Sequence, residues 1–231
     1  MFKKPYQALV QHRYKLTIFV LLTLSSATCV ILVGARVAYS DSERYISLVW
    51  NLFLAWIPFV LAYLAYALSW KRILIYFVIP IFAFLWLIFF PNAPYLITDI
   101  QHLADGLGEA PVWFDVILLI WFSWTGLLLG VVSLYLMQEI VKNEFGKFLG
   151  WTLVFTVSIL SSIGVYLGRF LRWNSWDILQ NPVEIIRDSW HLLRGLSRSA
   201  AGFTALFTVF FLFVYLTIYA FGHLHQEHNN A

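Results

Sequence analysis

Residues 112–137 read VWFDVILLIWFSWTGLLLGVVSLYLM, and this stretch decides the class of the protein. Its only charged residue is Asp115, near the start, and its apolar residues do not alternate with polar ones as they would in a strand. About 20 consecutive apolar residues cross the hydrocarbon core of a bilayer as a helix. A helix suits that environment because it satisfies its backbone donors and acceptors internally. Residues 112–137 are therefore predicted to form a transmembrane helix.

Five further apolar runs of similar length predict five more membrane crossings, at residues 16–35, 46–68, 73–90, 148–167 and 203–221. The composition agrees, because 61% of the 231 residues are hydrophobic and only 12% are charged, against about 25% charged in a soluble domain. These figures exclude a water-soluble globule and a disordered chain. We expect an all-α, polytopic membrane helix bundle of about six transmembrane helices, forming a single integral membrane domain over residues 1–231.

The first run is predicted to be a retained signal-anchor helix. Its apolar core of about 20 residues is longer than the 7–15 residues typical of a cleaved signal peptide. The chain has one cysteine, Cys29, which excludes a disulfide framework. Cys29 is expected to be a small, buried, apolar residue of this helix.

The distribution of lysine predicts the orientation of the chain in the membrane. All six lysines fall in the N-terminal tail and in the turns near residues 71 and 142–147, and such positions are typically cytoplasmic. Both termini are therefore predicted to be cytoplasmic. The segment 169–198 opposes this rule, since it carries five arginines on the predicted outer side. We expect those arginines to pair with acidic residues or lipid phosphates.

The first polar segment on the outer side is FPNAPYLITDIQH, residues 90–102. Pro91 and Pro94 predict that the third helix ends there in an extended turn. Thr98, followed by Gln101, resembles the capping box that starts a short helix. Asp99 and the histidine three residues later, His102, are predicted to share one helix face.

The second polar segment is GVYLGRFLRWNSWD, residues 164–177, at the outer end of the fifth helix. Arg169 and Arg172 are predicted to lie on one face of that helix. Further on, the order Asn, Pro, Val, Glu at 181–184 is typical of a helix start. Apolar residues then recur at 183, 186, 190 and 193, which predicts an amphipathic helix near 182–194 in the outer membrane interface.

The segments PNAPYLITDIQHL and YLGRFLRWNSWD, together with WNLFLAWIP at 50–58, resemble an uncharacterised family of bacterial integral membrane proteins. That family is known only as a domain of unknown function. The resemblance extends over nearly the whole chain. It implies a multi-pass protein of a bacterial plasma membrane, and it implies nothing about chemistry.

Ionisable and amide residues gather at the predicted outer interface, where charged side chains are costly and usually paired. One interpretation is a structural network that joins Asp99 or Asp115 to Arg169, and Asp177 to Arg172. The other is a ligand site, for which the candidate binding residues are Asn92, Tyr95, Asp115, Arg169, Arg172, Asn174 and Asp177. The sequence leaves these two interpretations open.

Three classes of function are compatible with these residues. The first is an outward-facing Arg/Asp cleft that binds, or acts on, a lipid or envelope-precursor headgroup. In that case Arg169 and Arg172 would hold phosphate, and Asp99 and His102 would be the catalytic residues for proton transfer. The alternatives are a small transporter and a non-catalytic subunit of a membrane complex. Whether the protein is an enzyme remains open at this level.

The sequence assigns no metal and no cofactor. A zinc site built from Asp99, His102 and either His191 or Asp177 is conceivable, but the spacing does not require one. The expected partners are membrane lipids, and no nucleic acid is expected because the lysines are explained by topology and anionic headgroups. The pairs Gly126/Gly130 and Gly164/Gly168 have GxxxG spacing. They predict close helix packing within the chain, or an oligomer or membrane partner through these faces.

Overall fold

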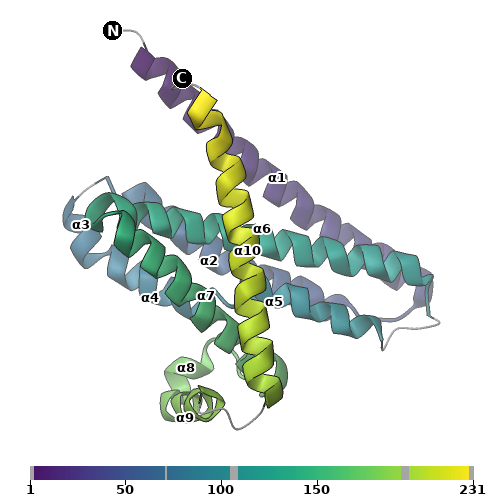
Figure 1. The fold of residues 1–231 in the computed structure, drawn as a ribbon. Helices are drawn as coiled ribbons and strands as arrows, with labels where there is room; N and C mark the ends of the chain where they lie inside the picture. Colours follow the sequence, from purple (N-terminus) through teal and green to yellow (C-terminus); the bar gives the residue numbers. More distant parts are fainter. Residues whose placement is uncertain (1–2, 71, 105–108, 194–197, 229–231) are drawn as a thin grey trace.

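The computed structural model describes residues 3–70, 72–104, 109–193 and 198–228, and within them the chain is helical with no strand (Figure 1). Six helical segments are long and apolar enough to cross a membrane, which confirms the predicted all-α, multi-pass bundle. Five are single helices: α1 (Lys3–Ser40), α2 (Ile46–Leu68), α6 (Val112–Phe145), α7 (Lys147–Phe170) and α10 (Arg198–His228). Helices α8 (Asp177–Gln180) and α9 (Pro182–Leu193) connect α7 to α10.

Several helices extend beyond the apolar runs that predict them. Helix α6 continues to Phe145 instead of ending near 137, and α7 continues to Phe170 instead of ending near 167. The extra turns contain charged residues, such as Lys142 and Arg169, that lie near the ends of the helices. Hydropathy marks only the part of a helix inside the hydrocarbon, whereas backbone hydrogen bonding continues until a residue such as Gly146, with a φ of 96°, stops it.

Helix α6 lies at the centre of the bundle and packs against α1, α2, α7 and the third span. Its buried side chains include polar groups as well as apolar ones. Ser133 accepts a hydrogen bond from the indole of Trp86, with a distance of 2.6 Å between Nε1 and Oγ. Thr125 lies against the thiol of the fully buried Cys29, as expected for that residue. In hydrocarbon such pairings are needed because no water is present to satisfy a buried hydroxyl or indole group.

The third span is broken into four pieces: α3 (Arg72–Phe77), α4 (Ile79–Phe89), α5 (Asn92–Tyr95) and the 3₁₀ helix η1 (Leu96–Leu103). The first break lies at Val78, two residues before Pro80. Proline has no N–H to donate to the preceding turn of a helix, and its ring crowds the carbonyl there. Of these pieces, the stretch Ile79–Leu103 is long and apolar enough to cross a membrane.

The extended turn and the capping box predicted for residues 91–101 are wrong. Pro91 has a helical φ of −57° and ψ of −26°, and the chain turns as a helix through α5 and η1. Proline is tolerated in a first helical turn because the missing N–H would have no partner there. Thr98 lies inside η1 and donates from its hydroxyl to the carbonyl of Tyr95 at 2.7 Å, so it caps nothing.

The broken segment lies between α6 and α7, and the four GxxxG glycines make room for it. A Cβ atom on Gly126 would lie 2.5 Å from the carbonyl oxygen of Ala93, and one on Gly164 would lie 2.6 Å from the Cγ of Pro91. The predicted close packing is therefore found within the chain. Residues 91–96 lie against both glycine faces. An oligomer or membrane partner through these faces stays a prediction.

Helix α9 turns its apolar stripe away from the protein. Val183 and Ile186 are each 68% exposed and Trp190 is 53% exposed, whereas Ile185 on the opposite face is buried against the end of α7. The observed helix begins at Pro182, as predicted for residues 182–194, and runs to Leu193. Residue 194 and the side chain of Leu193 lie outside the described residues. An exposed stripe of this kind suits a helix that lies in the plane of a membrane interface.

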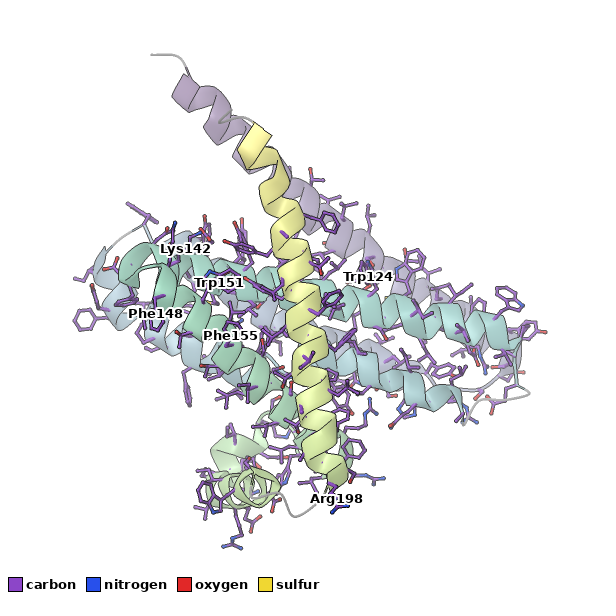
Figure 2. The ribbon with its side chains drawn as sticks, in the orientation of Figure 1. Trp124, Lys142, Phe148, Trp151, Phe155 and Arg198 are labelled. Carbon is purple, nitrogen blue, oxygen red and sulfur yellow. The ribbon has the colours of Figure 1, made fainter. Side chains whose placement is uncertain are left out.

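The two ends of the chain lie at the same end of the molecule, and helices α8 and α9 lie at the other end (Figure 1). Figure 2 shows Lys142, in the turn region predicted to be cytoplasmic, at the left of the molecule, and Arg198, in the region predicted to be external, at the bottom. An even number of crossings places both termini on one side of a membrane.

Candidate functional site

Asp99 and Arg169 form a buried ion pair between the third span and the end of α7. Arg169 donates from Nη2 to Oδ1 of Asp99, and the two side chains are 6% and 1% exposed. Asn51, from α2, donates from Nδ2 to the other carboxylate oxygen at 3.1 Å. Both oxygens of Asp99 therefore have donors, as a buried charge requires. This confirms one of the predicted pairings, Asp99 with Arg169.

The rest of the Arg169 guanidinium is held by neighbours on η1 and α5. Its Nε donates to the hydroxyl of Thr98 at 2.9 Å, and its Nη1 lies 3.3 Å from Nε2 of His102. Its Cζ lies 4.3 Å above the centre of the Tyr95 ring, a cation–π contact. Asp99 and His102 do share a face, with 3.8 Å between Oδ1 and Nε2. Arg169 is thus engaged on every side by the protein.

A second buried ion pair, Arg36 with Asp115, joins α1 to α6 and was not predicted as a pair from the sequence. Nε of Arg36 donates to Oδ1 of Asp115 at 2.7 Å, and both side chains are almost fully buried. The sequence indicates this pair only weakly. Arg36 is the only charged residue in the second half of the first span, and several acidic residues lie on the same predicted side of the membrane, so its partner could not be chosen among them.

The loops above this second pair extend the network toward solvent. Glu109 binds Arg44 at 2.5 Å and Arg36 at 3.3 Å. Hydrogen bonds from Arg44 and Ser42 lower the pKa of Glu109 to about 2. Burial, together with the nearby Asp115 carboxylate, raises the pKa of Tyr45 to about 12. Asp115 therefore belongs to a network that fastens α1 and the loops to α6.

A pocket of about 530 Å³ opens beside the first ion pair. Its inner wall is apolar and comes from α2, α4 and α7, for example Leu54, Leu87 and Leu160. Its outer rim is polar and aromatic, and comes from α2, α5, the loop after α7, and α9. The rim residues are Trp50, Asn51, Asn92, Tyr95, Arg172, Trp173, Asn174, Ser175, Trp176 and Ser189. Concave sites with an apolar wall and a few polar groups are typical of ligand pockets.

Arg172 is the charged residue among the side chains that line this pocket. Its side chain is exposed, and it forms no ion pair with any residue that the structure describes. The predicted pairing of Arg172 with Asp177 is therefore wrong. Asp177 instead accepts hydrogen bonds from the backbone N–H and the side-chain amide of Asn174, at 2.7 and 3.2 Å. This local bond is favoured because the two residues are only three positions apart in a turn.

The backbone of Arg172 is unusual, with a φ of 60°. It reverses the chain after α7 and allows the N–H of Trp173 to reach the carbonyl of Leu167 at 3.2 Å. Glycine or asparagine occupies this left-handed conformation at lower cost than arginine. Because strained residues concentrate at functional sites, an arginine at this position points to a role for its side chain.

The predicted site residues divide into three groups. Asn92, Tyr95, Arg172 and Asn174 line the pocket. Asp99, His102 and Arg169 lie behind its wall, and Asp115 and Asp177 lie elsewhere, in the contacts described above. The tryptophans of the rim, Ser175, Ser189 and the apolar wall were not predicted as site residues from the sequence. Nothing in a uniformly apolar run distinguishes a residue that lines a pocket from one that faces lipid, and only the fold brings the rim residues together.

A metal centre finds no support among the described side chains. Within residues whose side chains the structure describes, no three His, Cys, Asp or Glu residues lie close enough together to hold a metal ion. His191, one of the conceivable ligands, has a side chain outside that described part.

The family of the chain follows from its match to a family model. The model for "Protein of unknown function (DUF1361)" matches residues 50–218, which include the pocket and the Asp99–Arg169 pair. The chain belongs to this family. The DUF1361 region begins at Trp50, on the pocket rim, and leaves α1 outside the match. Neither a curated protein nor a solved structure matches the chain.

Proposed function

We propose that this DUF1361 protein binds the phosphate-bearing headgroup of an anionic lipid or lipid-linked envelope precursor at the outer face of a bacterial plasma membrane. The observation that carries the proposal is Arg172, an exposed arginine at the rim of an apolar-walled pocket that forms no ion pair with any side chain in the described part of the chain. A guanidinium in such a place supplies charge-assisted hydrogen bonds to a phosphate. The apolar wall below Arg172 can contact the hydrocarbon part of the lipid that carries the phosphate.

The position of the pocket next to α9 supports the same proposal. The pocket lies between α7 and α9, and α9 exposes Val183, Ile186 and Trp190 away from the bundle. If that stripe enters the headgroup region of the outer leaflet, the pocket lies at the depth of the lipid phosphates. The tryptophans on its rim suit the same depth, because indole rings favour the membrane–water interface.

The Asp99–Arg169 pair supports the pocket wall in this proposal. The clamp of two arginines predicted from the sequence is reduced to Arg172, since the guanidinium of Arg169 is occupied by Asp99, Thr98 and Tyr95. Asp99 and His102 lie behind the wall, and Asp99 already has donors on both oxygens. We therefore assign Asp99 to positioning Asn51 and Arg169, and we propose binding rather than proton transfer as the function.

The proposal is tested with Arg172→Asn, because asparagine tolerates the left-handed backbone while removing the charge. The variant should fold at least as stably as the wild type. It should lose its preference for phosphatidic acid over phosphatidylcholine by about tenfold or more, as expected for the loss of a charge-assisted hydrogen bond. The measurement is native mass spectrometry of protein released from bilayers that contain equal amounts of the two lipids.

The matched control is Arg187→Gln, which removes a charge from exposed α9 outside the pocket. This control should keep the lipid preference of the wild type. Equal preference for phosphatidic acid in wild type and Arg172→Asn would refute the proposed phosphate site. An equal loss of the preference for phosphatidic acid in Arg172→Asn and Arg187→Gln would show that only the net charge of the outer face matters. That outcome would also contradict the proposed phosphate site.

A second candidate, a small transporter, is favoured by one observation. The third span is broken at depth, and Pro91, Asn92 and Tyr95 from the break line the pocket. Discontinuous membrane helices form the substrate sites of many transporters. Flux of a solute through reconstituted vesicles, abolished by Asn92→Leu and unaffected by lipid headgroup, would favour this candidate over headgroup binding.

A further inference from the structure

Three asparagines line the pocket, and each uses its amide nitrogen to bind the protein. Asn51 donates to the Asp99 carboxylate at 3.1 Å. Asn92 donates to the carbonyl of Phe89 at 2.9 Å and to the hydroxyl of Ser175 at 2.7 Å. Asn174 donates to Asp177 at 3.2 Å. All three side chains come from different parts of the fold: α2, α5 and the loop after α7.

These partners determine which way the three amides are turned. An ionised carboxylate and a backbone carbonyl can only accept, so the amide nitrogen must face them and the amide oxygen must face elsewhere. No described residue donates a hydrogen bond to the Oδ1 atom of Asn51, Asn92 or Asn174. Among the described residues, buried polar atoms without a partner occur at Gln138, Ser161 and Thr204, and not at these amides. The free amide oxygens of the half-buried Asn51 and Asn92 are therefore accessible.

The polar rim thus has a defined chemical character. It offers one guanidinium donor, at Arg172, and three carbonyl-type acceptors at the asparagines. The hydroxyls of Tyr95 and Ser189 can donate or accept. Trp50, Trp173 and Trp176 add flat apolar surfaces at the same rim. A ligand that satisfies these groups must carry a phosphate and, close to it, several hydrogen-bond donors.

We infer that the headgroup bound in this pocket is a polyol phosphate, in which the phosphate is esterified to a hydroxyl-bearing group such as glycerol or a sugar. This inference rests on the proposed phosphate site and names its ligand class. Hydroxyl groups donate to the free amide oxygens, while the phosphate binds Arg172. An ammonium headgroup would also donate, but it would bring a second positive charge into the pocket that holds Arg172. Choline has no donor to offer.

The test compares phosphatidylglycerol with phosphatidylethanol, which carry the same charge and differ in the hydroxyls of the headgroup. Native mass spectrometry of the full chain released from bilayers with equal amounts of both lipids gives their binding ratio. The wild type should prefer phosphatidylglycerol by about tenfold, as expected for one or two hydrogen bonds. Because this comparison uses the wild type, it does not depend on whether a variant folds.

Variants then test whether the asparagines cause the preference for phosphatidylglycerol over phosphatidylethanol. Asn51→Leu should lower this ratio several-fold, because it removes one of the three acceptors at the rim. The same substitution at exposed Asn143, near the far end of α6, should leave the ratio unchanged. An unchanged ratio in Asn51→Leu would contradict the role of the amide oxygen.

The outcomes separate this inference from the proposed function. Equal binding of phosphatidylglycerol and phosphatidylethanol, with an anionic preference that Arg172→Asn abolishes, would refute the polyol and leave the phosphate site standing. Absence of any anionic preference would refute both. Equal binding of phosphatidylethanolamine and phosphatidylglycerol would also overturn the inference that the headgroup is a polyol phosphate. Soluble glycerol phosphate that displaces phosphatidylglycerol at equal concentration would show that the ligand is free rather than attached to a lipid.

Discussion

Asp99 is held by donors from two other helices, α2 and α7, and its removal should be costly. Arg169 and Asn51 both bind its carboxylate, inside a bundle where water cannot replace it. We expect Asp99→Asn to lower the free energy of unfolding by about 3–5 kcal/mol, because it leaves the buried Arg169 without a counter-charge. Chemical unfolding in detergent, followed by tryptophan fluorescence, measures this loss.

The control for this prediction is Asp41→Asn. Asp41 is exposed and has a φ of 53°, a conformation that asparagine also tolerates, so the change should stay within about 0.5 kcal/mol. The double variant Asp99→Asn, Arg169→Gln removes both charges and should recover part of the lost stability. A single Asp99→Asn variant as stable as the wild type would show that the buried pair contributes nothing to folding.

At the scale of elements, the glycines of α6 and α7 explain how a broken helix fits into the bundle. Both GxxxG pairs face the 91–96 segment, and the backbone of Ala93 approaches Gly126 closely. Proline-containing backbone is tolerated at membrane depth only where it is buried in protein or lines a cavity. Here it does both, since Ala93 and Pro94 are buried while Pro91 and Asn92 line the pocket.

Gly126→Ala should therefore destabilise the protein. The new methyl group would lie 2.5 Å from the carbonyl oxygen of Ala93, a backbone atom that cannot move without displacing α5. A loss of about 1–3 kcal/mol is typical of such overpacking. Thermal unfolding monitored by fluorescence-detected size-exclusion chromatography measures the shift.

Gly34→Ala provides the matched comparison, since a Cβ there meets nothing within 4 Å. In a helix this change should be neutral or stabilising by up to about 1 kcal/mol. If both variants had the same thermal stability, the close approach of α5 to α6 would not be a feature of the folded protein.

At the scale of the whole molecule, the fold predicts which segments share a side of the membrane. The turn between α6 and α7 and both termini are expected in the cytoplasm, and the α8–α9 region outside. In a Cys29→Ala background, a cysteine at Asn181 should react with a membrane-impermeant maleimide in intact cells. A cysteine at Asn143 should react only after permeabilisation. The reverse pattern would invert the orientation and remove the pocket from the outer leaflet.

Part of the candidate site could be predicted from local pattern. The spacing of Asp99 and His102 predicts their shared face, and the cost of a charge in a membrane predicts that Arg169 is paired. The choice among acidic partners could not be predicted. Asp115 binds Arg36 rather than Arg169, and Asp177 binds its neighbour Asn174, because these choices depend on which helices lie side by side.

What the amino-acid sequence determined by itself is the environment of the chain and the number of its crossings. In lipid, a uniformly apolar run of membrane length forms an α-helix. Its backbone groups find no water there, so they must form hydrogen bonds within their own segment. What only the tertiary structure decided is the pocket and the residues that face it. Arg169 and Arg172 are three positions apart, yet one is buried against Asp99 and the other is exposed at the rim. That difference arises because α7 ends between them, and the left-handed backbone of Arg172 turns the chain away from the bundle.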